Sequence, residues 1–407
     1  MYVWVINPEG KIDFKPIPLE EGLSSQVRLT RKVAASYIDR GDTDTGYLVW
    51  ARELRANGIN DSTQELIIDE DRQRAELKKL YQVLIAPIET FLPEPNSDTH
   101  LVFIPQGNLF QVPFAALQDE LGQYLINNYA IRIAPSLRVL KQSSKTFDPL
   151  PEGDEVLIVG NPLMPAFEFE GEESQPLPQL EGAQTEAQGL GDLFNTVPLI
   201  KNFASEALVR RKMSSARIIH LATHGILDNQ NLGLTAADLG QIIEQEFGTP
   251  ARRTAEYLSK LADDLLPGAI VLAQSKDEDG LLTSSEILGL DLDDAELVVL
   301  SACNTARGIT SESTVLGLPY ALGAAGASRV VVSLWSVPDK PTQALMQAFY
   351  MDMQSQAAAS EDVDPAQALR HAMSEIQQQE EFKDPVNWAG FNLIEVTQNP
   401  VEDTQDN

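Results

Sequence analysis

Residues 296–308 read ELVVLSACNTARG, and this stretch decides the fold. Positions 297–300 are apolar throughout, which is typical of a strand in a parallel sheet that helices cover on both faces. Residues 218–225, IIHLATHG, repeat this design, and the two stretches carry Cys303 and His224 just after their apolar runs. Sites in parallel α/β sheets form at the carboxyl ends of the strands, so we expect these two side chains to emerge at one edge.

The chain beyond residue 155 alternates between apolar runs of strand length and segments with helical spacing. The predicted strands lie at residues 155–160, 216–222, 269–273, 296–301 and 329–335, and the predicted helices at 184–193, 205–213 and 314–325. This alternation predicts an α/β fold, a three-layer sandwich around a mainly parallel central sheet. Polar residues 229–266 interrupt it, and we interpret them as a helical insertion on the surface.

The chain before residue 145 has a mixed pattern that predicts a smaller α/β lobe. Its predicted elements are a β-hairpin of residues 2–6 and 11–17, a helix around 75–88, strands at 101–105, 111–117 and 129–134, and a helix near 136–141. Residues 143–154 are rich in Ser, Asp, Pro and Gly, which is typical of a linker. We therefore predict an N-terminal lobe of residues 1–145, a second lobe of residues 146–400 and an acidic tail of residues 401–407.

The composition restricts the partners. Sixty acidic against 30 basic residues give a net charge of −30, which disfavours nucleic acid and anionic membrane surfaces and attracts basic substrates. The single cysteine cannot form an internal disulfide, which indicates a reducing compartment. The first residues lack the basic flank and apolar core of a signal peptide, and the apolar stretch 321–337 contains Arg329. These features predict a cytoplasmic location without a membrane span.

Cys303 and His224 have the chemistry of a catalytic dyad. An imidazole can stabilise a thiolate that attacks a carbonyl and then protonate the leaving amine. We expect Cys303 as nucleophile and His224 as general acid and base, with the backbone amides of Gly225 and Cys303 as oxyanion donors. The alternative is that Cys303 is a small apolar residue at the end of a core strand. The two residues are 79 positions apart, and without the insertion about 50 remain, the His-to-Cys separation of caspase-type enzymes.

Other features favour neither a metal nor a nucleotide. His220 and His224 are four positions apart, but no third ligand is near them in sequence, so we interpret His220 as a packed strand residue. The chain has no Gly-x-x-x-x-Gly-Lys-Ser/Thr loop for phosphates. We therefore predict no metal and no cofactor.

Four ordered blocks resemble the CHAT family of caspase-like cysteine peptidases, which are similar to separase. The blocks are LVFIPQGNLFQVPFAALQD at 101–119, IIHLATHG at 218–225, ELVVLSACNTARG at 296–308 and LGLPYALGAAGASRVVVSLWSVPD at 316–339. The resemblance implies a caspase-hemoglobinase fold, a pseudo-caspase lobe ahead of the active lobe, and protein substrates. It assigns the catalytic pair to His224 and Cys303.

The chain also departs from its relatives. Many family members carry tetratricopeptide repeats ahead of the peptidase, so we expect either a stand-alone form or part of a longer protein with a tetratricopeptide or other regulatory partner. The cysteine lies in Ser-Ala-Cys-Asn-Thr and not in the caspase sequence QACRG, which gives no support to cleavage after aspartate. A catalytically silent scaffold for protein interaction is the alternative function.

Two further residues concern specificity and processing. In separase a similar Leu-Trp-x-Val-x-Asp segment brings an acid to the pocket for the residue before the cleaved bond, and the resemblance places Asp339 there, so we expect cleavage after Arg or Lys. The alternative is that Asp339 caps a helix that begins near Lys340. Arg253 follows Arg252 in the insertion and is a candidate for self-cleavage. The alternative is that both arginines pair with nearby acids.

Overall fold

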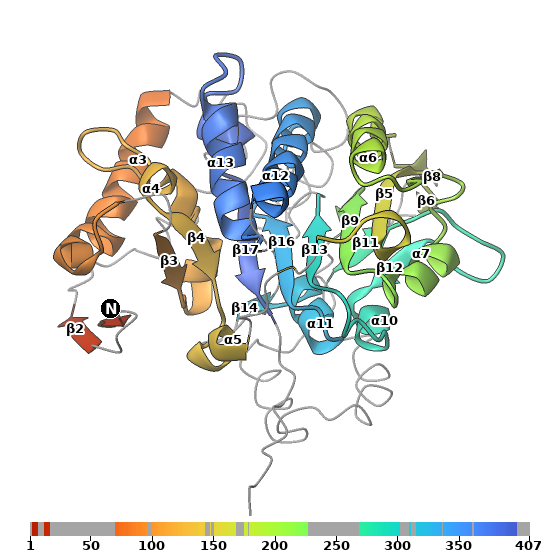
Figure 1. Cartoon of the computed structure of the whole chain (residues 1–407), viewed down its shortest axis with the longest axis horizontal. Helices are drawn as coiled ribbons and strands as arrows, with labels where there is room; N and C mark the ends of the chain where they lie inside the picture. Colours follow the sequence, from red (N-terminus) through yellow and green to blue (C-terminus); the bar gives the residue numbers. More distant parts are fainter. Residues whose placement is uncertain are drawn as a thin grey trace, which may run out of the picture.

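The apolar runs that precede Cys303 and His224 form neighbouring strands in the computed structural model of the chain (Figure 1). Strand β13 (Leu297–Leu300) runs parallel to β9 (Ile218–Ala222), with Leu300 opposite Leu221, and both strands are buried along their whole length. The structure describes residues 2–6, 12–16, 70–95, 99–142, 147, 150–167, 175–177, 179–226, 268–301, 309–310, 315–335, 337–359 and 362–396. The predicted insertion 229–266 and tail 401–407 lie outside them.

The two strands belong to an eight-stranded sheet. In spatial order it contains β3 (His100–Phe103), β4 (Ala130–Ile133), β17 (Phe391–Glu395), β16 (Arg329–Ser333), β13, β9, β5 (Val156–Pro162) and β8 (Leu199–Lys201). The strands from β16 to β8 are parallel, and β17 is antiparallel to β16. Strands β4 and β3 continue in the direction of β17. The predicted mainly parallel α/β sheet is confirmed.

Helices cover both faces of the sheet, which explains the apolar runs in its central strands. Helices α6 (Glu181–Leu193), α12 (Asp339–Ala359) and α13 (Pro365–Gln377) form one layer (Figure 1). Helices α7 (Glu206–Met213), α10 (Ser284–Leu288) and α11 (Leu318–Ala324) lie on the opposite face. The predicted three-layer sandwich is therefore confirmed. Among the described residues, no helix has the length and apolarity to cross a membrane.

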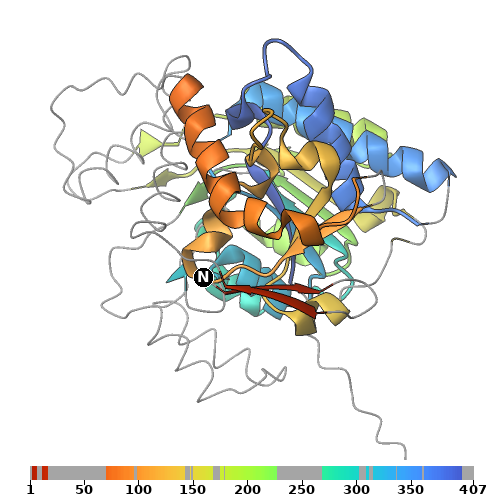
Figure 2. The same cartoon turned by 90° about the vertical axis from the view of Figure 1, so that its left-hand side faces the viewer.

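The elements before residue 145 agree with the sequence in part. The hairpin forms from β1 (Tyr2–Ile6) and β2 (Ile12–Pro16), and the predicted helix is α3 (Glu70–Leu84), which lies beside the β3 and β4 edge (Figure 2). The predicted strand at 111–117 is wrong, because this segment lies in the turns η3 (Gly107–Gln111) and η4 (Phe114–Ala116). Pro113 cannot donate a ladder hydrogen bond, and the Phe114 ring instead stacks on Phe103 with centroids 4.0 Å apart.

Short elements complete the described chain. They are η2 (Ala86–Phe91), α4 (Leu125–Asn128), α5 (Leu137–Gln142), η5 (Gly153–Glu155), β6 (Ala166–Phe167), β7 (Gln175–Pro176), β14 (Ile309–Thr310), β15 (Val315–Leu316) and η7 (Pro385–Asn387). The predicted strand at 269–273 forms as β11 (Ala269–Val271), but it lies outside the central sheet. It pairs with β10 (Gly225–Ile226) and β12 (Leu281–Thr283) in a small antiparallel sheet.

The central sheet continues across the predicted boundary near residue 145. Strands β3 and β4 precede that boundary, and β4 pairs with β17 from the end of the chain. We call the junction of β4, β17 and β16 the seam. There Glu395 of β17 is fully buried and accepts a hydrogen bond from Arg132 Nε of β4 at 2.7 Å. Glu395 also lies 3.5 Å from Arg329 Nε of β16. Both predicted lobes thus contribute to one sheet, and their division at residue 145 stays a prediction.

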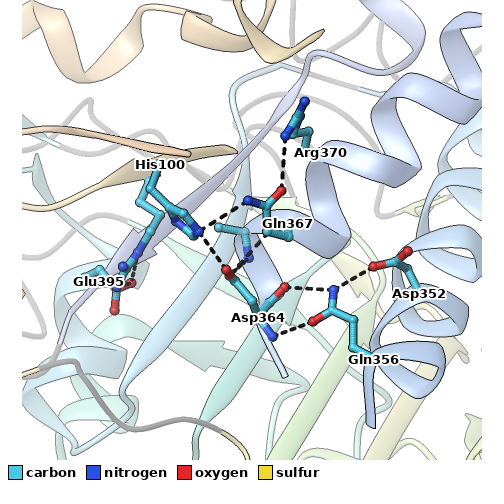
Figure 3. Close-up of polar contacts among 9 residues, drawn as sticks. His100, Asp352, Gln356, Asp364, Gln367, Arg370 and Glu395 are labelled. Carbon is cyan, nitrogen blue, oxygen red and sulfur yellow. Dashed lines mark hydrogen bonds and ion pairs between the residues drawn. The ribbon is translucent and has the colours of Figure 1, made fainter. Parts of the chain in front are cut away.

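A polar network joins β3 to the two helices above the seam (Figure 3). Asp364 is the N-cap of α13 and accepts from the amide of Ala366 at 2.9 Å and from His100 Nε2 at 2.8 Å. Gln356 of α12 bonds the backbone amide of Asp364 at 2.6 Å. Burial alone would raise the pKa of Asp364, but the hydrogen bonds from His100 and the helix amides outweigh it and lower that pKa. The network therefore favours an ionised cap that fixes α13 against α12.

A second network lies between the middle of the sheet and the same helical layer, where His220 of β9 is fully buried. Its Nε2 lies 2.8 Å from Glu186 Oε1 of α6, and its Nδ1 lies 3.2 Å from the Tyr350 hydroxyl of α12. Burial, with Glu186 nearby, raises the pKa of Tyr350 well above its usual value, so the phenol stays protonated. The interpretation of His220 as a packed strand residue is confirmed. The three side chains tie α6 and α12 to β9.

We predict that His220→Ala destabilises the protein by about 3–5 kcal/mol, because it leaves the buried Glu186 carboxylate without its partner. Urea unfolding followed by circular dichroism measures this change. The matched control is His371→Ala, since His371 also bonds a carboxylate, Asp352 at 2.9 Å, but has a side chain 51% exposed. We expect less than about 0.5 kcal/mol for the control. Similar small losses in both variants would contradict the account.

Candidate functional site

The carboxyl ends of the parallel strands meet at one edge of the sheet, as the sequence predicts. Leu221 of β9 lies directly opposite Leu300 of β13. His224 and Cys303 each follow their member of this pair by three residues. Cys303 itself lies among residues 302–308, outside the described residues.

The backbone of His224 is fixed by the small sheet beside it. Thr223 is buried and donates from Oγ1 to the carbonyl of Val271 at 2.7 Å. The amide of Val271 in turn donates to the carbonyl of His224 at 2.9 Å. The His224 residue is half-buried. Strand β11 therefore bonds residues 223 and 224 through both the carbonyl and the amide of Val271. This strand supports the predicted general acid and base.

Gly225 is the first residue of β10 and pairs with β11. It lies opposite Ile270, and the ladder bond next to this pair runs from the Val271 amide to the His224 carbonyl. Gly225 and Ile270 therefore form a non-hydrogen-bonded pair, whose amides point away from the partner strand. The amide of Gly225 is directed away from β11, consistent with its predicted role. The second predicted donor, the Cys303 amide, lies outside the described residues.

Asp339 follows the carboxyl end of β16 at the same edge. Helix α12 begins at Asp339, so the residue lies in the first turn of this helix. Its side chain is exposed and lies against the first turn of α6. A Cβ atom on Gly182 would stand 2.6 Å from Asp339 Cβ and 2.9 Å from Asp339 Oδ2. Glycine at position 182 is thus what lets the Asp339 carboxylate approach α6.

Asn161 is a structural residue of this edge that sequence reasoning did not identify. It is fully buried at the end of β5 and has a left-handed backbone with φ of 45°. Its Oδ1 accepts from the amide of Leu180 at 2.8 Å, and its Nδ2 donates to Gln184 Oε1 at 3.4 Å. Asn161 therefore ties the edge of the sheet to the start of α6, where Gly182 contacts Asp339. The sequence signal for Asn161 is the Gly-Asn-Pro triplet at 160–162 directly after an apolar run. Such a triplet indicates a left-handed residue at the end of a strand, because Asn tolerates that backbone conformation.

One group of carboxylates in the described chain has the spacing of potential metal ligands. Oxygens of Glu206, Glu278 and Glu286 lie within 4.8 Å of one another. Arg210 Nη1, however, lies 3.3, 3.5 and 3.4 Å from oxygens of these three residues. The Arg210 guanidinium therefore supplies a positive charge beside all three carboxylates. The other predicted site residue, Arg253, lies outside the described residues.

Comparison with known proteins identifies relatives. The CHAT domain family matches residues 74–395. The chain is 30% identical over 331 residues to tetratricopeptide repeat protein 28 of Homo sapiens and, equally, to that of Mus musculus. The aligned region covers 78% of this chain and 13% of the length of each relative. The chain thus spans about an eighth of these longer proteins.

Two solved structures are similar over most of the chain. The Saccharomyces cerevisiae separase–securin complex aligns with a TM-score of 0.43 and 13% identity, over 96% of this chain and 21% of that chain. The Arg-specific cysteine proteinase gingipain R aligns with a TM-score of 0.39 and 7% identity, over 84% of this chain and 69% of that chain. The family match covers most of the sequence and contains every predicted site residue. The chain belongs to the CHAT domain family.

Proposed function

We propose that this chain is a cysteine endopeptidase that cleaves proteins through a dyad of Cys303 and His224. The observation that supports the proposal most strongly is the register of β9 and β13. Because Leu221 and Leu300 are paired and parallel, the residues three positions beyond each follow the same edge of the sheet. A nucleophile and a base are both needed there for acyl transfer, and the chain has its single cysteine at one of these positions and a histidine at the other.

The proposed reaction uses the chain's own groups in two steps. His224 takes the thiol proton, and the Cys303 sulfur attacks the peptide carbonyl, while the amides of Gly225 and Cys303 stabilise the oxyanion. The C–N bond then breaks as His224 protonates the leaving amine, which leaves a thioester. Water attacks the thioester with His224 as base, and the carboxyl product leaves as Cys303 recovers its proton. The fixed backbone of His224 and the outward amide of Gly225 support these roles.

The proposed substrates are proteins cleaved after Arg or Lys, with Asp339 as the acid that binds the basic side chain. Its exposed carboxylate at the first turn of α12 and the net charge of −30 both support a cationic ligand. We propose a tetratricopeptide-repeat or other regulatory partner, because the curated relatives carry that name. The lone cysteine fits a reducing compartment, and we propose the cytoplasm.

We predict that Cys303→Ala and His224→Ala each lower kcat/KM on a protein substrate by about 10³-fold or more, because the two residues act as a unit. Release of peptides, followed by mass spectrometry, measures turnover. His371→Ala is the matched control, since it removes a histidine on α13 outside the site and should leave turnover unchanged. Circular dichroism verifies that all variants fold. Turnover that survives in either dyad variant would exclude this mechanism, whereas a folded wild type without turnover would favour the silent scaffold.

For specificity, we expect Asp339→Ala to lower kcat/KM on arginyl peptides by roughly 30-fold or more, since a bound guanidinium would lose its ion-pair partner. As a first-turn acid only, the residue would contribute about 1 kcal/mol to stability and nothing to cleavage. Steady-state kinetics on arginyl and neutral peptides, together with urea unfolding, separate these roles. An unchanged rate on arginyl peptides removes the pocket assignment.

The glycines of α6 supply a matched pair for the same test. Gly182→Ala keeps the Asp339 carboxylate but forces it away, because the new Cβ would overlap Asp339 Cβ. Gly189→Ala meets only the end of the flexible Gln347 side chain, at 2.6 Å, so it should be tolerated. Both changes raise helix propensity by about 1 kcal/mol. Selective loss of arginyl cleavage in Gly182→Ala is the expected result.

Self-cleavage after Arg253 is the remaining proposal. Incubation of wild type beside Cys303→Ala, with mapping of new N-termini by mass spectrometry, tests it. A new N-terminus at Thr254 in wild type alone is expected, because an exposed loop can enter a cleft without unfolding the core. An intact wild-type chain under conditions where a peptide substrate is hydrolysed would show that Arg252 and Arg253 serve as ordinary ion-pair residues.

A further inference from the structure

Glu206, the first residue of α7, is a fully buried carboxylate within a cluster of ionisable groups. The groups that face it are Arg210 of the same helix, Glu278 of the turn before β12, and Glu286 of α10. The side chains of Arg210, Glu278 and Glu286 are each about 30% exposed. With all four groups ionised, the cluster has an excess of negative charge that a single guanidinium does not neutralise.

Glu206 also closes the turn between β11 and β12. Its Oε2 accepts from the amide of Gly280 at 3.1 Å, and its own amide donates to the carbonyl of Ala273 at 3.2 Å. The amide of Leu272 donates to the carbonyl of Gly280 at 2.8 Å. Gly280 has φ of 87°, and a Cβ there would stand 2.6 Å from the Leu272 carbonyl oxygen. The two ends of the turn therefore meet on one buried carboxylate.

The bonded path continues from this turn to the histidine. Val271 precedes Leu272; its carbonyl accepts from the side-chain hydroxyl of Thr223, and its amide donates to the carbonyl of His224. On the other side, Val271 lies opposite Leu281 of β12, and Glu286 accepts from the amide and hydroxyl of Thr283, each at 2.8 Å, where β12 ends. The same cluster thus fixes both ends of β12 and, through β11, the backbone of His224.

The charge of Glu206 changes near neutral pH. Burial, followed by the carboxylates of Glu286 and Glu278, raises its pKa from 4.5 to about 7, against the opposing effects of the Gly280 amide and Arg210. A raised pKa means that the folded cluster favours the protonated acid. The stability that this proton contributes is complete below pH 4.5 and is lost as the pH rises toward 7. Above that range the carboxylates repel one another beneath β11.

We propose that Glu206 is a positioning residue for His224, with the protonated cluster holding the Gly280 turn and β11 closed and the fully ionised cluster letting them open. This inference rests on the proposed role of His224 as acid and base. In this proposal the charge of the cluster controls the position of the His224 imidazole, although the cluster does not touch the reacting atoms.

Hydrogen exchange of residues 268–283, measured by mass spectrometry in Cys303→Ala protein at pH 6 and pH 8, tests the coupling without any turnover. After correction for intrinsic exchange rates, opening of this segment should increase about tenfold between the two pH values, the change expected of an acid with a pKa of about 7 when closed and 4.5 when open. Glu206→Gln keeps the length of the side chain and should abolish the increase. Glu296→Gln, which removes an Arg217 ion pair at the other edge of the sheet, should keep it.

The kinetic arm uses enzymes with Cys303 intact. From pH 6 to pH 8, kcat should fall more in wild type than in Glu206→Gln, by up to about tenfold where the open form predominates, with KM unchanged. Equal protection at both pH values, or the same pH step in Glu206→Gln, overturns the proposal. A normal exchange step with identical kcat profiles also overturns it, because Glu206 would then be structural only. Exchange as expected in a wild-type protein that cleaves nothing would instead refute the proposed peptidase function and leave the coupling of the cluster to β11 intact.

Discussion

The parallel register of β9 and β13 is the constraint on which the rest of the structure depends. Two strands that are buried on both faces lie between helical layers, and their shared direction brings their carboxyl ends to the same end of the sheet. Every predicted site residue in the described chain comes after the carboxyl end of one of these parallel strands. His224 and Gly225 come after β9, and Asp339 comes after β16. The geometry of the site is thus a consequence of how the core is packed.

A layer of buried polar contacts adds precision to this apolar framework. His220 connects α6 and α12 through Glu186 and Tyr350, and Asn161 connects β5 to the start of α6. The Asn161 connection anchors the start of α6, where Gly182 lies against Asp339. Hydrogen bonds with fixed directions are suited to this task, because buried polar groups tolerate few arrangements in which every partner is satisfied.

The sequence predicted most of the central strands well, because a run of apolar residues is a local signal, and the carboxyl ends of β9 and β13 lie side by side as expected. It failed where the outcome depends on contacts between distant segments. Residues 111–117 have a β-like composition, but Pro113 and the packing of Phe114 on Phe103 decide the local structure. Strand β17 joins β4 to β16 through pairings about 60 and 260 residues apart in sequence, which no local pattern contains. Glu206 and Glu186 were missed for the same reason, since an acid in a polar helix gives no sign that it is buried.

The reactivity of the single cysteine tests the central claim most directly. Alkylation of Cys303 by iodoacetamide can be followed by mass spectrometry from pH 5 to pH 10 in wild type and in His224→Ala, with no other thiol in the chain to confuse the signal. The account predicts that wild type reacts rapidly well below the ordinary thiol pKa of about 8.5, and that His224→Ala shifts the reaction to that ordinary range. Identical pH profiles in the two proteins would contradict the pairing of Cys303 with His224.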